Sequence, residues 1–154
     1  YKNLVANLCL PKTNDKVAVV IAIGGSEGGI GTGNSNGEMI APHGVAVLGL
    51  AYFKEKGISE TLDHIPLEYF KDAIDFLETI DEIDASRVGF VGGSRGAELA
   101  LLLASKEARI KSVVATTPSS VAWYGLTTSQ SAWTLNGKDI PALSLELDNR
   151  PPIQ

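Results

Sequence analysis

Ser94 is the residue of this sequence whose surroundings best suit nucleophilic chemistry. It lies in Gly92-Gly93-Ser94-Arg95-Gly96, which fits the pattern G-x-S-x-G. A serine hydroxyl is a weak nucleophile, so it must be held exposed, beside a base and close to donors for the negative charge on an attacked carbonyl oxygen. A sharp strand-to-helix turn achieves this, and glycines two positions before and after the serine avoid a clash. The pattern predicts a catalytic nucleophile, with an ordinary structural turn as the alternative.

Two backbone N–H groups are candidates for an oxyanion hole. A helix that begins just after Ser94 brings its positive end, including the Arg95 N–H, to the attacked carbonyl oxygen. The second candidate is the N–H of Ser26, because the glycines before it let the backbone turn back over the strand ends. The sequence therefore predicts an oxyanion hole formed by the amides of Ser26 and Arg95.

The glycine-rich stretch that contains Ser26, GGSEGGIGTGNSNG at 24–37, also invites a nucleotide-binding interpretation. The dinucleotide spacing G-x-G-x-x-G fails, because Asn34 or Asn36 stands where glycine is required. The P-loop pattern fails as well, because Ile30 stands where lysine is required. A flexible connection is the remaining alternative to an oxyanion loop.

Strands alternating with helices must position these residues. Strands are expected at 4–10, 17–23, 44–53, 87–92 and 111–118, and helices at 37–42, 66–80 and 95–106. This order predicts an α/β fold with a mostly parallel sheet and helices on both faces. In such sheets, ligand-binding and catalytic residues lie at the carboxyl ends of the strands. The nearly all-apolar helix after Ser94 should be buried beside the sheet, and the chain beyond residue 118 has no clean period and should be irregular surface structure.

The segments RVGFVGGSRGAELALLLAS, IPLEYFKDAIDFLE and IGGSEGG resemble the C-terminal catalytic domain of the acyl-CoA thioesterase and bile acid-CoA:amino acid N-acyltransferase family. These proteins are α/β-hydrolases related to the dienelactone hydrolases. The resemblance implies an α/β-hydrolase fold and thioester cleavage with Ser94 as the nucleophile. It also implies the Ser26 and Arg95 amides as the oxyanion hole. Within the family, a cysteine nucleophile tends to accompany amino-acid conjugation, whereas a serine nucleophile tends to accompany simple hydrolysis. Ser94 therefore favours hydrolysis.

The histidine and acid that such a nucleophile needs are not evident in this chain. His43 and His64 are the only histidines, and both precede Ser94, whereas the family places its acid and histidine after the nucleophile. His43 is expected at the amino end of a strand, away from the site. His64 follows that strand and could lie near the active rim, but we interpret it as a loop histidine.

None of the acids after Ser94 has a context that marks it as the triad acid. They are Glu98, Glu107, Asp139, Glu146 and Asp148. Glu98 follows one helical turn after Ser94, and the others are expected to be solvated. We therefore expect residues 1–154 to be a single α/β-hydrolase domain, incomplete at its C-terminus, with the strands that carry the acid and the histidine beyond this chain.

The aromatic residues beyond residue 118 are the remaining candidates for a substrate pocket. Trp123, Tyr124 and Trp133 could line an acyl pocket or lid, although ordinary packing under a long loop is the preferred interpretation. No basic cluster for coenzyme A is visible.

The composition limits the kinds of partner that this protein is expected to have. The chain has 154 residues, a formal net charge of −5 and one cysteine. The negative charge argues against nucleic acid or an anionic membrane as partner. Cys9 can form no internal disulfide or cysteine-based metal site and is expected to be a buried strand residue. No membrane span or signal peptide is visible, so a cytoplasmic setting is expected.

Two functional hypotheses follow. The first is a serine hydrolase that cleaves a small-molecule ester or thioester, such as an acyl-CoA, through an acyl-enzyme on Ser94, with no cofactor or metal. The alternative is a hydrolase-like domain that binds a ligand or partner without catalysis. A dienelactone-type esterase would share the fold but usually has cysteine as its nucleophile.

Overall fold

A mostly parallel sheet forms the centre of the molecule. The computed structural model describes residues 3–127 and 129–144. Five strands pair in the order β1-β3-β2-β5-β6, with β1 antiparallel to β3 and the other pairs parallel. Their bounds are β1 Val5–Cys9, β2 Val17–Ile23, β3 Ala46–Ala51, β5 Ile83–Gly93 and β6 Ile110–Thr116. The predicted mostly parallel sheet is therefore confirmed.

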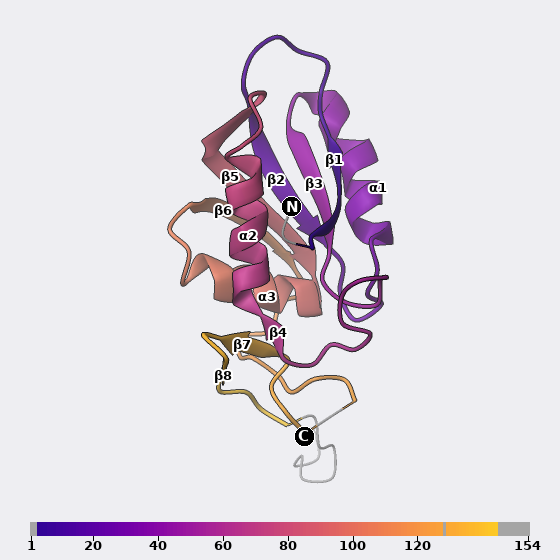
Figure 1. The fold of residues 1–154 in the computed structure, drawn as a ribbon, viewed down its shortest axis with the longest axis vertical. Coiled ribbons are helices and arrows are strands. Elements are labelled where there is room, and N and C mark those ends of the chain that lie inside the picture. Colours follow the sequence, from indigo (N-terminus) through magenta and orange to yellow (C-terminus); the bar gives the residue numbers. More distant parts are fainter. Residues whose placement is uncertain (1–2, 128, 145–154) are drawn as a thin grey trace, which may run out of the picture.

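Helices cover both faces of this sheet, as expected (Figure 1). Their bounds are α1 Gly31–Ile40, η1 Ala41–His43, α2 Leu67–Leu77 and α3 Arg95–Ala104. In the registers of β2, β3 and β5, Ile21 pairs with Leu48 and with Phe90, so these side chains share one face. Phe70 of α2 packs on Phe90 at 6.4 Å between ring centroids. On the opposite face, α1 contacts β3 through its glycines.

The continuous apolar sequence of β2 follows from this two-sided cover. Val19, Ile21 and Ile23 are buried toward α2 and α3, and Ala22 is buried on the α1 side. Strands covered on both faces are selected for apolar residues at every position rather than at alternate ones. The prediction of a strand at 17–23 is confirmed with the same bounds.

The glycine-rich stretch differs from its prediction. A short helix was expected at 37–42, whereas α1 occupies Gly31–Ile40 and includes the second half of the stretch. A Cβ on Gly33 would lie 2.8 Å from the Cα of Gly49 in β3, so the glycines permit a close approach of helix to strand. Gly37 likewise contacts the thiol of Cys9, which is half-buried rather than fully buried as expected.

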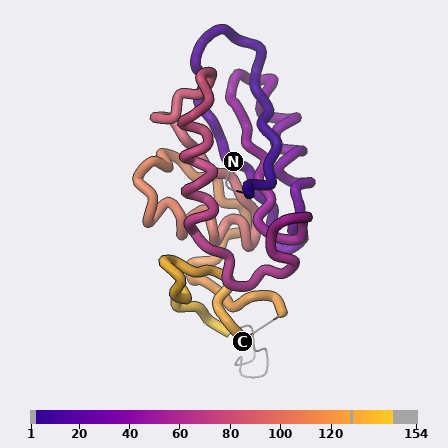
Figure 2. The backbone as a smooth tube through the Cα atoms, in the orientation of Figure 1, coloured from indigo at the N-terminus to yellow at the C-terminus, as the bar shows by residue number. Residues whose placement is uncertain are grey.

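A second, small sheet corrects the expectation of irregular structure beyond residue 118. It contains β4 (Ile65–Pro66), β7 (Trp133–Leu135) and β8 (Lys138–Asp139) in the order β4-β7-β8. Figures 1 and 2 show it beyond the end of the main sheet at which β2 and β5 finish. Trp133 is fully buried and belongs to the main core, so this segment packs against the domain.

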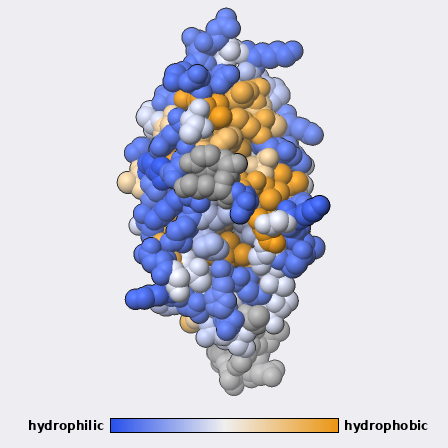
Figure 3. Space-filling model, viewed as in Figure 1, coloured by the Kyte–Doolittle hydropathy of each residue, from blue (hydrophilic) through white to orange (hydrophobic). Residues whose placement is uncertain are grey.

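The outer surfaces complete the fold. Leu99 and Leu103 of α3 are buried, so α3 packs beside the sheet as expected, and Leu101 on its outer side is 43% exposed. Apolar side chains gather beside α2, over β1 and β3 (Figure 3), where Leu4, Leu8 and Phe76 line a shallow hollow. Within the described ranges, no helix has the length and hydrophobicity needed to cross a bilayer.

An ion cluster joins α2 to the loop before β6. The Arg109 guanidinium donates to both carboxylate oxygens of Glu107, at 3.0 and 2.9 Å. It also donates to Asp75 at 2.7 Å and to Glu78 at 2.9 Å, both in the α2 region. These hydrogen bonds from Arg109 lower the pKa of Glu107 to about 2. Glu107 is therefore paired, rather than solvated as expected.

We expect Glu107→Gln to lower the free energy of unfolding at pH 7 by about 1 kcal/mol, because a bidentate charged pair is lost. A carboxyl whose pKa is lower in the folded state stabilises the fold above its unfolded pKa and loses that effect as pH falls through its folded pKa. The difference between parent and variant should therefore shrink as pH falls from 4.5, the ordinary pKa of Glu107, to about 2. Denaturant titrations across this range measure it. Glu60→Gln, on an exposed loop, is the matched control; equal stability of parent and Glu107→Gln at pH 7 would contradict the expectation.

Candidate active site

Ser94 occupies a strained turn between β5 and α3. Its backbone has φ 52° and ψ −116°, a conformation that costs a non-glycine residue free energy and persists only where surrounding structure enforces it. The Ser94 N–H donates to the Thr116 carbonyl at the end of β6, at 2.9 Å. Its own carbonyl accepts from the N–H groups of Ala97 and Glu98. The serine is exposed, as a nucleophile must be.

The glycines around Ser94 are required by backbone contacts. A Cβ on Gly92 would overlap the carbonyl of Gly96, and a Cβ on Gly96 would overlap the carbonyl of Gly24. A Cβ on Gly25 would lie 3.3 Å from the Cβ of Ser94. The turn after β5 therefore packs directly against the loop after β2, which places that loop beside Ser94.

One cavity contains all three residues that the sequence singled out. It has a volume of about 270 Å³ and is lined by Ser26, Ser94, Arg95, Glu98, Thr117, Pro118, Ser119, Trp123 and Leu126. Among residues 3–127 and 129–144, the N–H groups of Ser26 and Arg95 have no hydrogen-bond acceptor. The structure thus brings two uncommitted donors and the Ser94 side chain to one cavity, while their catalytic roles stay predictions.

Arg95 and Glu98 form a buried ion pair that sequence reasoning missed. Nη1 of Arg95 lies 2.8 Å from Oε2 of Glu98, and the two side chains are only 8% and 3% exposed. The Arg95 guanidinium also lies over the ring of Trp133, 5.9 Å from its centroid. The only sequence signal was an Arg and a Glu three positions apart, a spacing that is equally common on solvated helix faces.

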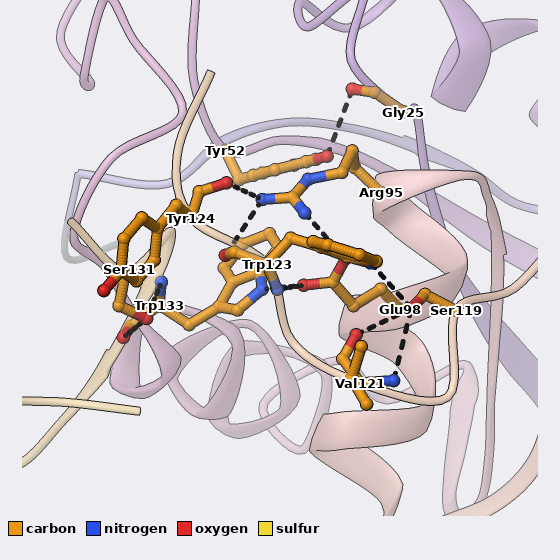
Figure 4. Close-up of polar contacts among 10 residues, drawn as sticks. All are labelled: Gly25, Tyr52, Arg95, Glu98, Ser119, Val121, Trp123, Tyr124, Ser131 and Trp133. Carbon is orange, nitrogen blue, oxygen red and sulfur yellow. Dashed lines mark hydrogen bonds and ion pairs between the residues drawn. The ribbon is translucent and has the colours of Figure 1, made fainter. Parts of the chain in front are cut away.

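The pair holds the segment that carries the predicted pocket aromatics (Figure 4). Nη2 of Arg95 donates to the carbonyl of Tyr124 at 2.8 Å and to that of Trp123 at 3.3 Å. Oε1 of Glu98 accepts from the indole of Trp133 at 2.7 Å and from the Trp123 N–H at 3.1 Å. Of the three aromatics, Trp123 lines the cavity, whereas Trp133 is a core residue.

The burial of this pair has opposite electrostatic consequences for its members. Burial raises the pKa of Glu98, against the lowering effect of its hydrogen bonds from Trp133 and Arg95. Burial lowers the pKa of Arg95, against the raising effect of the Glu98 carboxylate. Each charge is therefore sustained by its partner. The Glu98 carboxylate accepts three hydrogen bonds, from Arg95, Trp123 and Trp133, which give it a structural role.

Of the described residues, no histidine lines the Ser94 cavity. His43 is exposed in η1, before the amino end of β3, as predicted. His64 is an exposed loop residue, also as predicted, and its Nε2 lies 3.1 Å from Oδ1 of Asp139 in β8. Asp139 is exposed but paired, and the remaining acids, Glu146 and Asp148, lie outside the described residues.

A family comparison agrees with the resemblance seen in the sequence. The family model described as "BAAT / Acyl-CoA thioester hydrolase C terminal" matches residues 65–144, which include Ser94 and the segment that the buried pair holds. The match covers half of the chain. The predicted resemblance to this family is confirmed.

Similar proteins include both thioesterases and acyltransferases. Acyl-coenzyme A amino acid N-acyltransferase 1 of Mus musculus is 41% identical over 78 residues, which are 51% of this chain and 18% of that protein. Acyl-coenzyme A thioesterase 6 of Mus musculus is 34% identical over 100 residues, which are 65% of this chain and 23% of that protein. The chain therefore spans about a fifth of the length of these relatives.

The fold is shared with solved structures. The alpha/beta hydrolase GrgF from Penicillium sp. sh18 superposes with a TM-score of 0.66 and 15% identity, over 78% of this chain and 42% of that one. At this identity the likeness concerns the fold alone. The predicted α/β-hydrolase fold is confirmed.

We expect Gly96→Ala to destabilise the protein by roughly 2–4 kcal/mol, or to displace the loop after β2, because the new methyl group overlaps the carbonyl of Gly24. Gly93→Ala is the matched control, since a Cβ there meets nothing within 4 Å. Thermal and denaturant unfolding of both variants make the comparison. Equal stability of the two variants would show that the close approach at Gly96 is not a constraint.

Removal of one member of the buried pair should cost more than replacement of both. We expect Glu98→Ala to destabilise by roughly 3–5 kcal/mol, because Arg95 is left charged and without its counterion. The double variant Arg95→Met/Glu98→Leu should be less destabilised than the sum of its single variants, because no buried charge remains. Unfolding measurements on the parent, Arg95→Met, Glu98→Leu and the double variant form a double-mutant cycle. Strict additivity would contradict a direct interaction.

Proposed function

This chain belongs to the BAAT / acyl-CoA thioester hydrolase C-terminal family, and from that premise we propose that the protein hydrolyses a carboxylic ester or thioester through an acyl-enzyme on Ser94. The observation that carries the proposal is the backbone of Ser94, strained at φ 52° and ψ −116° yet exposed at the mouth of a cavity. An ordinary structural turn has no need of such a conformation, whereas a nucleophile at a strand-to-helix turn does.

The proposed reaction has two balanced halves. Ser94 Oγ attacks the substrate carbonyl carbon and its proton passes to a general base, while the carbonyl oxygen becomes an oxyanion. The N–H groups of Ser26 and Arg95, which have no other acceptor among the described residues, would donate to that oxyanion. Collapse expels the alcohol or thiol, which takes the proton. Water then attacks the acyl-serine by the same route and releases the acid.

The general base in this proposal is a histidine that lies outside this chain, together with its acid. His43 is at the opposite end of β3 from the site, and His64 is paired with Asp139 rather than directed to the cavity. Within residues 1–154, the single α/β-hydrolase domain would then supply the nucleophile and the oxyanion hole. The base and acid are assigned to the full-length protein.

A small-molecule thioester is the substrate class that the relatives support. Their names describe acyl-coenzyme A thioesterases and amino acid N-acyltransferases. We assign hydrolysis rather than transfer, because the nucleophile is serine and not cysteine. The net charge of −5 favours a small-molecule substrate over nucleic acid, and we place the reaction in the cytoplasm.

We expect Ser94→Ala in the full-length protein to lower kcat for acyl-CoA or p-nitrophenyl ester hydrolysis by about 10³-fold or more, because the acyl-enzyme cannot form. A fluorophosphonate should label the parent at Ser94 and leave the variant unlabelled. Ser35→Ala, an exposed substitution in α1, is the control for serine loss.

Full turnover by Ser94→Ala would show that the nucleophile is wrongly assigned. A parent protein that binds acyl-CoA but neither hydrolyses it nor reacts with the fluorophosphonate would favour the non-catalytic ligand-binding alternative.

A further inference from the structure

The loop that carries Ser26 depends on a buried tyrosine from another part of the chain. Tyr52 directly follows β3, and its hydroxyl lies 3.0 Å from the Gly24 carbonyl oxygen and 3.2 Å from the Gly25 carbonyl oxygen. Figure 4 shows this hydroxyl directed to Gly25, above the Arg95 guanidinium. Tyr52 does not line the Ser94 cavity. Tyr52 therefore has no direct contact with a substrate in this cavity, and the loop is the part of the site to which it is hydrogen-bonded.

The Gly25 carbonyl and the Ser26 N–H belong to the same peptide unit. That unit is planar and trans, so its C=O and N–H point in opposite directions. A donor fixed on the carbonyl side therefore sets the direction of the N–H on the other side. The Tyr52 hydroxyl has one proton, which it shares between the Gly24 oxygen at 3.0 Å and the Gly25 oxygen at 3.2 Å, and it so restrains the peptide unit that carries the Ser26 N–H.

Glycine is the reason why this peptide needs to be held. Gly24 and Gly25 have no Cβ to restrict φ and ψ, so their peptide units can rotate at small steric cost. The carboxylate of Glu27 holds the loop from another direction: its Oε1 accepts from the Gly25 N–H at 2.9 Å and from the Thr32 hydroxyl at 2.8 Å. The peptide units on both sides of Gly25 are thus fixed by side chains.

Tyr52 is itself held firmly enough to act as a reference point. It is 2% exposed, and its ring packs against Phe53, Phe70 and Trp133 at centroid distances of 5.1, 5.8 and 5.9 Å. Burial raises the pKa of Tyr52 above its ordinary value, with a further raising effect from Glu27. The hydroxyl therefore stays protonated, and so remains a donor, throughout the neutral range.

We propose that Tyr52 is a positioning residue for the reaction at Ser94, and that it acts by hydrogen bonding through the Gly25 carbonyl to direct the Ser26 N–H at the developing oxyanion. This inference rests on the proposed function. It adds a residue that touches no substrate and that the G-x-S-x-G pattern does not include. The contribution is to the transition state, because the carbonyl oxygen acquires its full charge only there.

The test compares two tyrosine-to-phenylalanine variants of the full-length protein. Tyr52→Phe keeps the ring and deletes the hydroxyl, and we expect kcat to fall about 10- to 100-fold with KM within about twofold, part of the 10²–10³-fold effect of losing a whole oxyanion donor. Tyr69→Phe is the matched control. Its hydroxyl also donates to a backbone carbonyl, that of Ala51 at 2.7 Å, but on the β1 side of α2. We expect it to leave kcat unchanged, with a comparable loss of thermal stability.

A second pair of variants covers the outcome in which Tyr52→Phe does not fold. Glu27 is exposed, so Glu27→Ala should fold normally while releasing the Gly25 N–H, and we expect kcat to fall about three- to tenfold at unchanged KM. Glu27→Gln keeps an acceptor oxygen and should restore most of the parent kcat. Unchanged kcat in Glu27→Ala would overturn the idea that the orientation of this loop limits the rate.

The outcomes separate the two proposals. If Ser94→Ala abolishes turnover but Tyr52→Phe matches Tyr69→Phe in kcat per folded molecule, the positioning role is overturned and the nucleophile stands. An increase in KM with unchanged kcat would also overturn it, because that pattern indicates altered substrate binding. If Ser94→Ala retains full turnover, the proposed function fails and the positioning role fails with it.

Discussion

The close approach of backbone segments at the carboxyl ends of β2 and β5 is the constraint on which the site depends. Gly96, at the start of α3, contacts the Gly24 carbonyl, and Gly92 contacts the Gly96 carbonyl, with no room for a side chain at either contact. This packing requires β5 to pass into α3 without a wider loop, and Ser94 absorbs the bend in a conformation that costs about 1–3 kcal/mol. The hydrogen bond from Ser94 to Thr116 and the first bonds of α3 offset that cost.

The buried Arg95–Glu98 pair extends this constraint from backbone to side chains. Both residues belong to the first turn of α3, so their positions are set by the same bend that exposes Ser94. Together they form hydrogen bonds with backbone groups of Trp123 and Tyr124 and with the indole of Trp133. A segment with little periodicity of its own is thereby held over the strand ends, where it forms one wall of the cavity. The position of this wall relative to Ser94 is fixed, because the first turn of α3 holds both of them.

Sequence patterns predicted the parts of this structure that depend on local chemistry. The apolar run of β2 and the amphipathic pattern of α2 located those elements, and the glycines around Ser94 predicted the turn. Contacts between distant segments were beyond such reasoning. The glycine-rich sequence of α1 predicted a loop, because the contact that requires its glycines is with Gly49, in the distant strand β3. The segment around Trp133 was expected to be irregular, because the hydrogen bond that fixes Trp133 is accepted by Glu98, thirty-five positions earlier in the sequence.

The two candidate oxyanion donors differ in what makes them rigid. The Arg95 N–H is fixed by the helix that it begins, so its direction follows from the backbone of α3. The Ser26 N–H belongs to a glycine loop, which is held by the side chains of Tyr52, just after β3, and of Glu27. Glycine gives this loop the close approach to Ser94 that a side chain would prevent, and the same absence of Cβ leaves its peptide units free to rotate. A buried tyrosine that holds the carbonyls resolves the conflict, because it restricts the loop from behind without occupying space beside the nucleophile.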